Sequence, residues 1–294
     1  EAGDLRALSQ RFGSRRRLGG SHDCRAPHRL GYGGGNLGAA EFPGFPLSAF
    51  GITGQMHGVV CLNDAGRPVT EESYNTTFNN YYEFGSSKRI ARAADALPIR
   101  PWTIAIDGEV EKPMTLAIDD LLKQVSLEER IYRHRCVEAW AMVVPWTGFP
   151  LARLVEIARP TANAKYVRFE TFNNPEIASG QQPGLFGAYP WPYVEGLTLA
   201  EATNDLAFLV TGAYGKPVAR SMGAPLRLHL PWKYGFKSAK SIVKIRFVEK
   251  QPRASWEQAN PQEYGFYSNV NPQVDHPRWS QAAERRIGEG GLFE

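Results

Sequence analysis

The apolar residues of this chain switch repeatedly between strand spacing and helix spacing, in no regular order. Alternating apolar residues predict strands near residues 102–106, 131–137, 166–171, 224–230 and 241–248. Apolar residues at helical spacing predict helices over residues 117–125 and 150–158. Asp107 and Gly108 predict a hairpin turn, with a return strand through Val110 and a break at Pro113. Such an irregular mixture of strands and short helices is typical of an α+β domain.

The first 68 residues differ in character from the rest of the chain. They contain about half of the 29 glycines and show no sustained periodicity, so we expect an irregular segment at 1–68 and one domain at 69–294. Residues 14–18 (SRRRL) resemble a twin-arginine export signal, but the apolar stretch that should follow is absent. Residues 33–38 (GGGNLG) fit the pattern of a dinucleotide-binding loop, yet no strand precedes them, which favours a flexible loop.

Charge and composition argue against several classes of protein. The 34 Lys and Arg residues against 30 Asp and Glu give a net charge of +4 without a basic arm, so we expect no nucleic-acid partner. No run of eighteen apolar residues occurs, and we therefore expect membrane contact only through a partner. The three cysteines, Cys24, Cys61 and Cys136, form no C-x-x-C pair, so neither a disulfide framework nor a closed zinc site is expected.

One cysteine lies at the end of a predicted strand in a pattern that suggests chemistry. Alternation places Tyr132, His134 and Cys136 on one face of the strand and Arg133 and Arg135 on the other. Nearby positive charge is expected to lower the pKa of the thiol, which would favour a metal ligand or a nucleophile. The same pattern also fits a small buried cysteine. A zinc site with His134 is a further alternative, although two more ligands are not visible nearby.

A second group of candidate residues is basic. Arg227, Lys233, Lys237 and Lys240 surround a turn that contains glycine. Fixed positive charges and hydrogen-bond donors at such a turn suit a phosphate group. A solvated basic face explains the composition equally well.

The region around Cys136 is identified by resemblance. Residues 132–150 (YRHRCVEAWAMVVPWTGFP) resemble the metal-ligand region of the catalytic subunits of methionine-sulfoxide reductases, a branch of the sulfite-oxidase superfamily. Further similar segments are 79–85 (NNYYEFG), 163–166 (NAKY), 231–237 (PWKYGFK) and 275–280 (DHPRWS). The resemblance extends over roughly residues 74–291 and leaves out the first 68.

This resemblance implies a fold, a cofactor and a set of binding residues. The implied fold is a mixed α+β, sulfite-oxidase-like molybdopterin-binding domain. The implied cofactor is a mononuclear molybdenum atom on one pterin dithiolene, with Cys136 as its protein ligand and catalytic residue. The positions implied to bind the cofactor are Asn79, Tyr82, Glu83, Cys136, Thr171, Met222, Arg227, Ser238, Ala239 and Lys240.

Met222 departs from the family pattern. The family usually has asparagine before the Gly-Ala-Pro sequence that here begins at Gly223. A thioether cannot donate a hydrogen bond, so one cofactor contact is in doubt. The remaining contacts are expected to retain the cofactor.

The resemblance also implies a reaction and a setting. The expected reaction is oxygen-atom transfer from free or protein-bound methionine sulfoxide, which repairs oxidised proteins of the cell envelope. A monomeric catalytic subunit in the bacterial periplasm, reached by twin-arginine export, is expected. This chain contains no haem motif, so electrons should come from a haem-bearing membrane subunit.

Three other functions remain open at this point. A sulfite oxidase would use the same metal centre, but no clear extra dimerisation domain follows Ile245. A nicotinamide-binding protein would depend on residues 33–38. A non-catalytic binding module would contain Cys136 merely as a buried residue.

Overall fold

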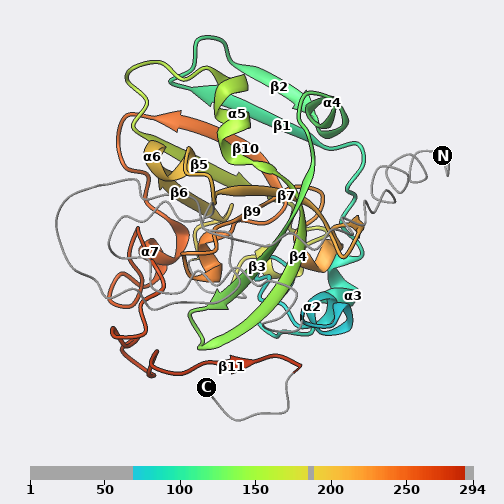
Figure 1. Cartoon of the computed structure of the whole chain (residues 1–294), viewed down its shortest axis with the longest axis vertical. Helices are drawn as coiled ribbons and strands as arrows, with labels where there is room; N and C mark the ends of the chain where they lie inside the picture. Colours follow the sequence, from blue (N-terminus) through green and yellow to red (C-terminus); the bar gives the residue numbers. More distant parts are fainter. Residues whose placement is uncertain (1–68, 185–188, 289–294) are drawn as a thin grey trace, which may run out of the picture.

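The computed structural model describes residues 69–184 and 189–288. The predicted segment 1–68, with its twin-arginine-like and glycine-rich stretches, lies outside the described residues. The described part combines two sheets with short helices, so the predicted α+β class is confirmed (Figure 1).

The first sheet has five strands in the order β2-β1-β10-β5-β6. Their bounds are β2 Met114–Ala117, β1 Thr103–Gly108, β10 Ile242–Val248, β5 Tyr166–Thr171 and β6 Val194–Thr198. β1 and β10 pair in parallel although they lie far apart in the sequence, whereas the other neighbours are antiparallel. The alternating burial along β5 matches its sequence pattern, because one face of a strand packs on the core while the other is exposed.

The predicted hairpin exists, but its turn is longer than expected. β1 and β2 are antiparallel neighbours, yet the return strand begins at Met114, after Pro113, and not at Val110. Gly108 has a φ of +84°, and a Cβ atom there would lie 2.1 Å from the backbone oxygen of Phe247. Val110 instead bridges to Pro160. Contact with another strand therefore decides the length of this turn.

The second sheet has six strands and carries the cysteine of interest. Its members are β3 Glu128–Cys136, β4 Trp140–Pro150, β7 Phe208–Ala213, β8 Lys216–Pro217, β9 Arg227–His229 and β11 Arg285–Arg286. β3 and β4 form a long antiparallel hairpin whose last pair is Cys136 with Trp140. The sequence pattern did not predict β4, because almost all of its residues are buried and no polar residue marks an exposed face.

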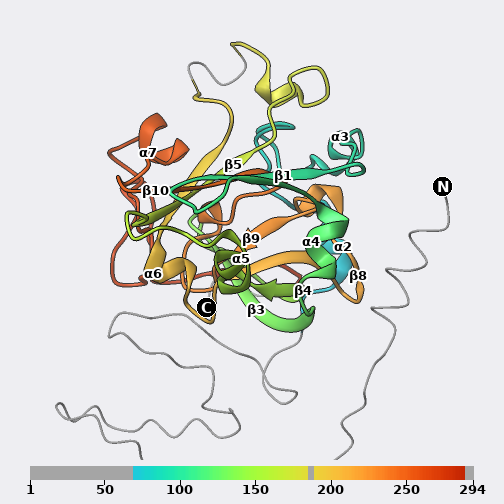
Figure 2. The same cartoon turned by 90° about the horizontal axis from the view of Figure 1, so that it is seen from above.

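The helices are short and lie around the sheets. The predicted helices correspond to α4 Ile118–Lys123 and α5 Leu151–Ala158, and the others are α2 Glu72–Thr77, α3 Ala91–Ala94, α6 Leu199–Ala202 and α7 Ser255–Ala259. Figure 2 shows the arrangement from above. No helix among the described residues has both the length and the apolar character needed to cross a membrane.

Candidate active site

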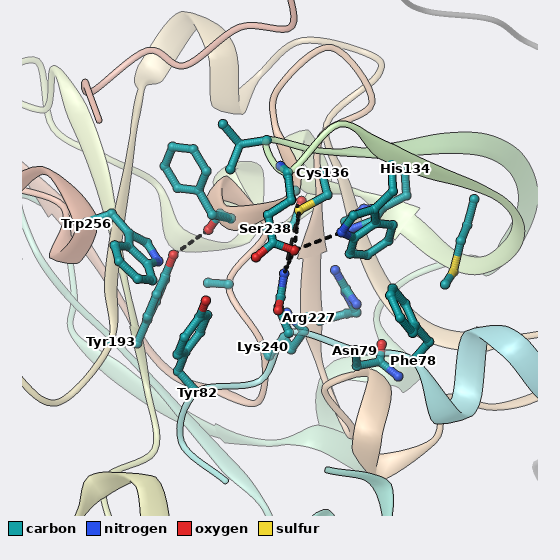
Figure 3. A pocket seen from close by; sticks show the side chains of 18 of the residues that line it. Phe78, Asn79, Tyr82, His134, Cys136, Tyr193, Arg227, Ser238, Lys240 and Trp256 are labelled. Carbon is teal, nitrogen blue, oxygen red and sulfur yellow. Dashed lines mark hydrogen bonds between the residues drawn. The ribbon is translucent and has the colours of Figure 1, made fainter. Parts of the chain in front are cut away.

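A pocket opens where the β3–β4 hairpin meets the loops after α2 and β9 (Figure 3). Its space amounts to about 860 Å³, part of it open to solvent. Eight of the ten predicted cofactor-binding residues line it, namely Asn79, Tyr82, Glu83, Cys136, Arg227, Ser238, Ala239 and Lys240. Thr171 and Met222 do not line it. The fold thus collects side chains from four separate parts of the sequence around one pocket.

Cys136 ends β3 and its thiol faces the pocket. Its side chain is only 5% exposed, and its Sγ accepts hydrogen bonds from Asn80 Nδ2 at 3.6 Å and from the backbone N–H of Glu138 at 3.4 Å. Burial, together with the nearby Glu138 carboxylate, raises the pKa of the Cys136 thiol to about 12. The thiol is therefore protonated at neutral pH unless a metal or another cation binds it.

The structure contradicts the expectation that neighbouring arginines lower the pKa of Cys136. Arg133 and Arg135 do point to the opposite face of β3, as the alternation predicted, but both pair there with Glu284. Arg135 Nη1 lies 2.7 Å from the Glu284 carboxylate. Because this carboxylate offsets their charge, the two arginines do not stabilise a thiolate on the pocket side.

The pocket contains an ionic cluster beside Cys136 that the sequence pattern did not reveal. The Glu138 carboxylate accepts hydrogen bonds from Asn80 Nδ2 at 3.1 Å and Trp140 Nε1 at 2.9 Å, and Lys88 Nζ lies 2.6 Å away. Burial alone would raise the pKa of Glu138, but these three donors together lower it. The carboxylate is therefore ionised. In the sequence, only the position of Glu138 two residues after Cys136 indicated that it could belong to the site.

Two basic side chains, Arg227 and Lys240, lie at the base of the pocket. Arg227 is 2% exposed and its Nη2 has no hydrogen-bond partner, while Nη1 donates to the backbone oxygen of Met222 at 2.6 Å. Burial lowers the pKa of Arg227 to about 10. The Glu83 carboxylate favours the charged form of Lys240, whereas no described carboxylate acts on Arg227 in this way, and Ser238 Oγ is unpartnered. A buried guanidinium with a free donor is stabilised by an anion, so the geometry around Arg227, Ser238 and Lys240 suits a phosphate group.

The other two predicted phosphate ligands are wrong. Lys233 Nζ pairs with Glu201 at 2.5 Å, and Lys237 Nζ pairs with Glu195 at 2.6 Å. Both lysines are fully buried and neither lines the pocket. Their partners lie more than thirty residues away in the sequence and could not be inferred from local composition.

Thr171 acts on the pocket through Glu83. Thr171 Oγ1 donates a hydrogen bond to the Glu83 carboxylate at 3.0 Å. Burial raises the pKa of Glu83, whereas burial and the nearby charge of Arg227 lower the pKa of Lys240. The Glu83 carboxylate acts in the opposite direction and raises the pKa of Lys240. Thr171 therefore supports a wall of the pocket from behind.

Met222 lies in the core. Its side chain is 1% exposed, and the residue ends a short 3₁₀ helix, Arg220–Met222. Only its backbone oxygen reaches toward the site, where it accepts the hydrogen bond from Arg227. The sequence expected Met222 to be a weakened cofactor contact, and the structure provides no pocket position for its side chain.

Aromatic side chains line the pocket, and of these only Tyr82 was predicted as a cofactor-binding residue. Tyr82, Trp256 and Tyr264 make consecutive ring contacts, with centroid distances of 5.1 Å and 5.0 Å. Figure 3 shows Tyr82, Trp256 and Tyr193 on one side of the pocket, with His134 and Phe78 on the other. All of these side chains line the pocket. The entrance is therefore largely apolar and has a few polar groups, as small-molecule sites generally do.

Comparison with known proteins identifies the family. The model of the oxidoreductase molybdopterin binding domain matches residues 91–256, which is more than half of the chain. This chain belongs to that family. The molybdopterin-binding fold and the oxidoreductase class expected from the resemblance are thereby confirmed.

Two known proteins illustrate the similarity. The chain is 58% identical over 227 residues to the protein-methionine-sulfoxide reductase catalytic subunit MsrP of Burkholderia mallei (strain ATCC 23344), covering 76% of this chain and 67% of that protein. The crystal structure of the sulfane dehydrogenase SoxCD from Paracoccus pantotrophus matches with 16% identity and a TM-score of 0.47, over 75% of this chain and 59% of that chain. The second similarity is too distant to support an argument about function.

The residues of this molybdopterin-binding domain fit the cofactor that its family binds. Cys136 offers a soft sulfur donor of the kind that binds transition metals. Arg227 Nη2 and Ser238 Oγ are buried donors without partners, as expected where a bound group completes the hydrogen bonding. Among the described residues no group of three or more His, Cys, Asp and Glu side chains could hold a metal ion. The described residues therefore offer the metal one sulfur ligand, Cys136, and offer an anion the unpartnered donors at the lower end of the pocket.

Proposed function

We propose that this chain is a molybdenum-dependent methionine-sulfoxide reductase. The overall reaction takes a sulfoxide, two electrons and two protons and gives a thioether and water. The observation that carries the proposal is a pocket that brings the buried Cys136 thiol together with Lys240 and with Arg227, a buried cation whose Nη2 has no hydrogen-bond partner. The 58% identity to a reductase of this name supports the choice of substrate.

The proposed cofactor is one pterin dithiolene with one molybdenum atom. Cys136 would be the protein ligand of the metal, and Arg227, Ser238 and Lys240 would bind the phosphate of the pterin. Asn79, Ala239 and the Tyr82–Glu83 pair would contact the rest of the pterin. When bound, the metal supplies a centre that accepts an oxygen atom and cycles between oxidation levels, which no side chain can do.

The cluster around Glu138 is suited to supply protons. Lys88 Nζ lies 2.6 Å from the ionised Glu138 carboxylate, and Asn80 Nδ2 joins that carboxylate to the Cys136 sulfur. Forming water consumes two protons, and a carboxylate between solvent and the pocket can take up protons from solvent and pass them on. Lys88 and Glu138 are both partly exposed, so solvent reaches this cluster.

The aromatic mouth is suited to hold a methionine side chain. Sulfur atoms contact aromatic rings favourably, and each such contact contributes about 0.3–1.5 kcal/mol. Trp256 and Tyr264 present half-buried rings on the rim. An apolar rim also admits the side chain of a sulfoxide that is part of a protein, because the peptide backbone can remain outside.

The wider setting is proposed from the similarity to MsrP. We expect one-electron delivery by a haem-bearing membrane subunit, a monomeric catalytic subunit, a periplasmic location after twin-arginine export and oxidised envelope proteins as substrates. The division into a segment 1–68 and one catalytic domain 69–294 belongs to the same proposal.

The decisive test combines composition with activity. The purified chain, produced with excess molybdate, should contain molybdenum and release a fluorescent pterin on denaturation. With a reduced viologen dye it should reduce methionine sulfoxide, and Cys136→Ser should abolish this activity while leaving the fold intact. Near-normal activity in Cys136→Ser would show that the ligand assignment is wrong.

Alternative substrates separate this proposal from its rivals. Sulfite oxidation with no sulfoxide reduction would favour a sulfite oxidase. Turnover with NADH in place of the dye would favour a nicotinamide enzyme, whose glycine-rich loop at 33–38 lies outside the described residues. Absence of molybdenum from the purified chain would favour a binding module.

A further inference from the structure

The hairpin turn that carries Cys136 is held from outside by the C-terminal part of the chain. The contacts come from residues 279–285, which we call the C-terminal clamp. In Figure 1, β11 at the end of this clamp lies beside the β3–β4 hairpin. The clamp lies outside the range 91–256 that matches the family model.

The first point of contact is the carbonyl group that follows Cys136. The backbone oxygen of Val137 accepts a hydrogen bond from Trp279 Nε1 at 2.7 Å and another from Gln281 Nε2 at 2.6 Å. A carbonyl oxygen has two lone pairs, so both acceptor sites are occupied by the clamp. Trp279 is itself fixed by stacking on His276, with ring centroids 3.7 Å apart.

The second point of contact is the side chain that precedes Cys136. Arg135 Nη2 donates to the backbone oxygen of Gln281 at 3.0 Å and to its Oε1 at 2.9 Å, and it also reaches the backbone oxygen of Ala283 at 3.2 Å. Arg135 Nη1 pairs with Glu284. Arg135 and Glu284 are both buried, so these charge-assisted bonds are well shielded from water.

The third point of contact closes the turn. The backbone N–H of Arg285 donates to the backbone oxygen of Ala139 at 2.9 Å. Ala139 has a φ of +58°, a left-handed conformation that favours glycine, so this turn needs support from its surroundings. The clamp thus holds the residue before Cys136, the residue after it and the last residue of the turn.

We propose that the C-terminal clamp is a positioning device that fixes the direction in which the Cys136 thiolate enters the pocket. This inference rests on the proposed function only in treating Cys136 as the metal ligand. The angle of a metal–thiolate bond depends on the backbone that carries the sulfur, and groups behind a ligand commonly tune the metal through it. Trp279 and Gln281 are then positioning residues, because neither side chain lines the pocket.

The test removes the hydrogen-bond donors while preserving side-chain shape. Trp279→Phe keeps the ring on His276 and deletes the indole N–H, and Gln281→Glu keeps the acceptor for Arg135 and deletes the donor to Val137. The matched control is Trp102→Phe, which deletes another buried indole bond, from Nε1 to the backbone oxygen of Ile242 at 2.8 Å, away from the turn. All variants are made in a background with Cys24→Ser and Cys61→Ser, so that Cys136 is the only thiol.

The first readout is the alkylation rate of Cys136 in full-length chain produced without molybdate. The double variant Trp279→Phe/Gln281→Glu should react about tenfold faster than the background, and Trp279→Phe alone should react severalfold faster. The control should stay within about twofold. Equal alkylation rates in the double variant and the Trp102→Phe control would overturn the proposal. Such a result would show that losing any buried hydrogen bond exposes Cys136 equally, whether or not the bond belongs to the clamp.

The second readout uses the molybdenum-loaded protein. The thiolate-to-metal absorption bands of Trp279→Phe should shift or broaden, and kcat should fall with little change in KM, whereas Trp102→Phe keeps the parent spectrum. A parent-like spectrum in both clamp variants would also overturn the proposal. If Cys136→Ser kept its metal bands and activity, the ligand assignment would fail, while the alkylation result would still report on the clamp independently.

Discussion

Arg227 and Lys237 are both buried cations, but the structure predicts opposite consequences when each is replaced by methionine. Lys237 has a carboxylate partner in Glu195, whereas Arg227 has no partner carboxylate within 4 Å among the described residues. We therefore expect Arg227→Met to leave the stability of the cofactor-free protein nearly unchanged and to impair cofactor retention. Lys237→Met should instead lower the stability.

The magnitudes follow from the surroundings of each cation. Burial lowers the pKa of Arg227 from 12.5 to about 10, which at about 1.36 kcal/mol per pH unit corresponds to roughly 3 kcal/mol against the charged form. Replacement removes this cost but also removes the hydrogen bonds to the backbone oxygens of Met222 at 2.6 Å and Leu228 at 3.3 Å, together about 2–3 kcal/mol, and the contact with the Trp146 ring at 4.9 Å. These contributions nearly cancel, so the net change should stay within about 1 kcal/mol.

The loaded protein should respond differently. Each charge-assisted bond from Arg227 to a phosphate contributes about 1.5–3 kcal/mol, so its loss should weaken cofactor binding roughly tenfold to a hundredfold. Lys237→Met leaves Glu195 buried without its partner, which costs about 3–5 kcal/mol when a buried pair is broken. Its loss of stability should therefore appear even without the cofactor.

Two measurements check this contrast. Thermal unfolding of cofactor-free protein, followed by circular dichroism, gives the stability of each variant. Molybdenum content after dialysis of loaded protein gives the retention. If cofactor-free Arg227→Met is destabilised as strongly as Lys237→Met, the charge of Arg227 is satisfied within the protein, and the argument for an anion at the base of the pocket fails.

Three further predictions concern the pocket walls and the thiol. Gly180→Ala should destabilise the protein by more than about 2 kcal/mol and reduce its molybdenum content, because a Cβ there would lie 1.9 Å from the backbone oxygen of Tyr82 in the pocket wall. The control Gly265→Ala should change neither stability nor molybdenum content, because a Cβ there would meet no atom within 4 Å. Glu138→Gln should lower the pKa of the Cys136 thiol, because a neighbouring negative charge is removed. Alkylation of the cofactor-free protein at pH 8 should then become severalfold faster, and an unchanged pH profile of alkylation would contradict this electrostatic account. Met222→Asn should leave molybdenum content unchanged or lower and should cost about 1–3 kcal/mol of stability, because it buries an amide in the core; a rise in metal content would show that this side chain reaches the cofactor.

Local patterns in the sequence predicted the elements that have one buried and one exposed face. β5 and α4 appear almost where the spacing of apolar residues placed them. β4 was missed because it is buried along nearly its whole length, so its sequence contains no alternation. Gly108 marked a turn correctly, but its close approach to Phe247 of β10 decided where the return strand begins.

The candidate site shows the same limit for charged groups. Alternation along β3 correctly separated Cys136 from the two arginines on the opposite face. It could not reveal that Glu284 pairs with both of them, or that the thiol's own neighbour would be the Glu138 carboxylate. The predicted direction of the pKa shift at Cys136 was therefore wrong.

The sequence by itself determined the α+β class, the face of β3 on which Cys136 lies and, through its resemblance, the family and eight of the residues that line the pocket. Only the tertiary structure decided which buried cations are paired, which direction the pKa of Cys136 takes and how its turn is held. The physical reason is that periodicity arises from backbone geometry over a few residues, whereas charge pairing depends on distant segments meeting in space. Arg135 and Glu284, which are separated by 149 positions in the chain, show this difference most clearly.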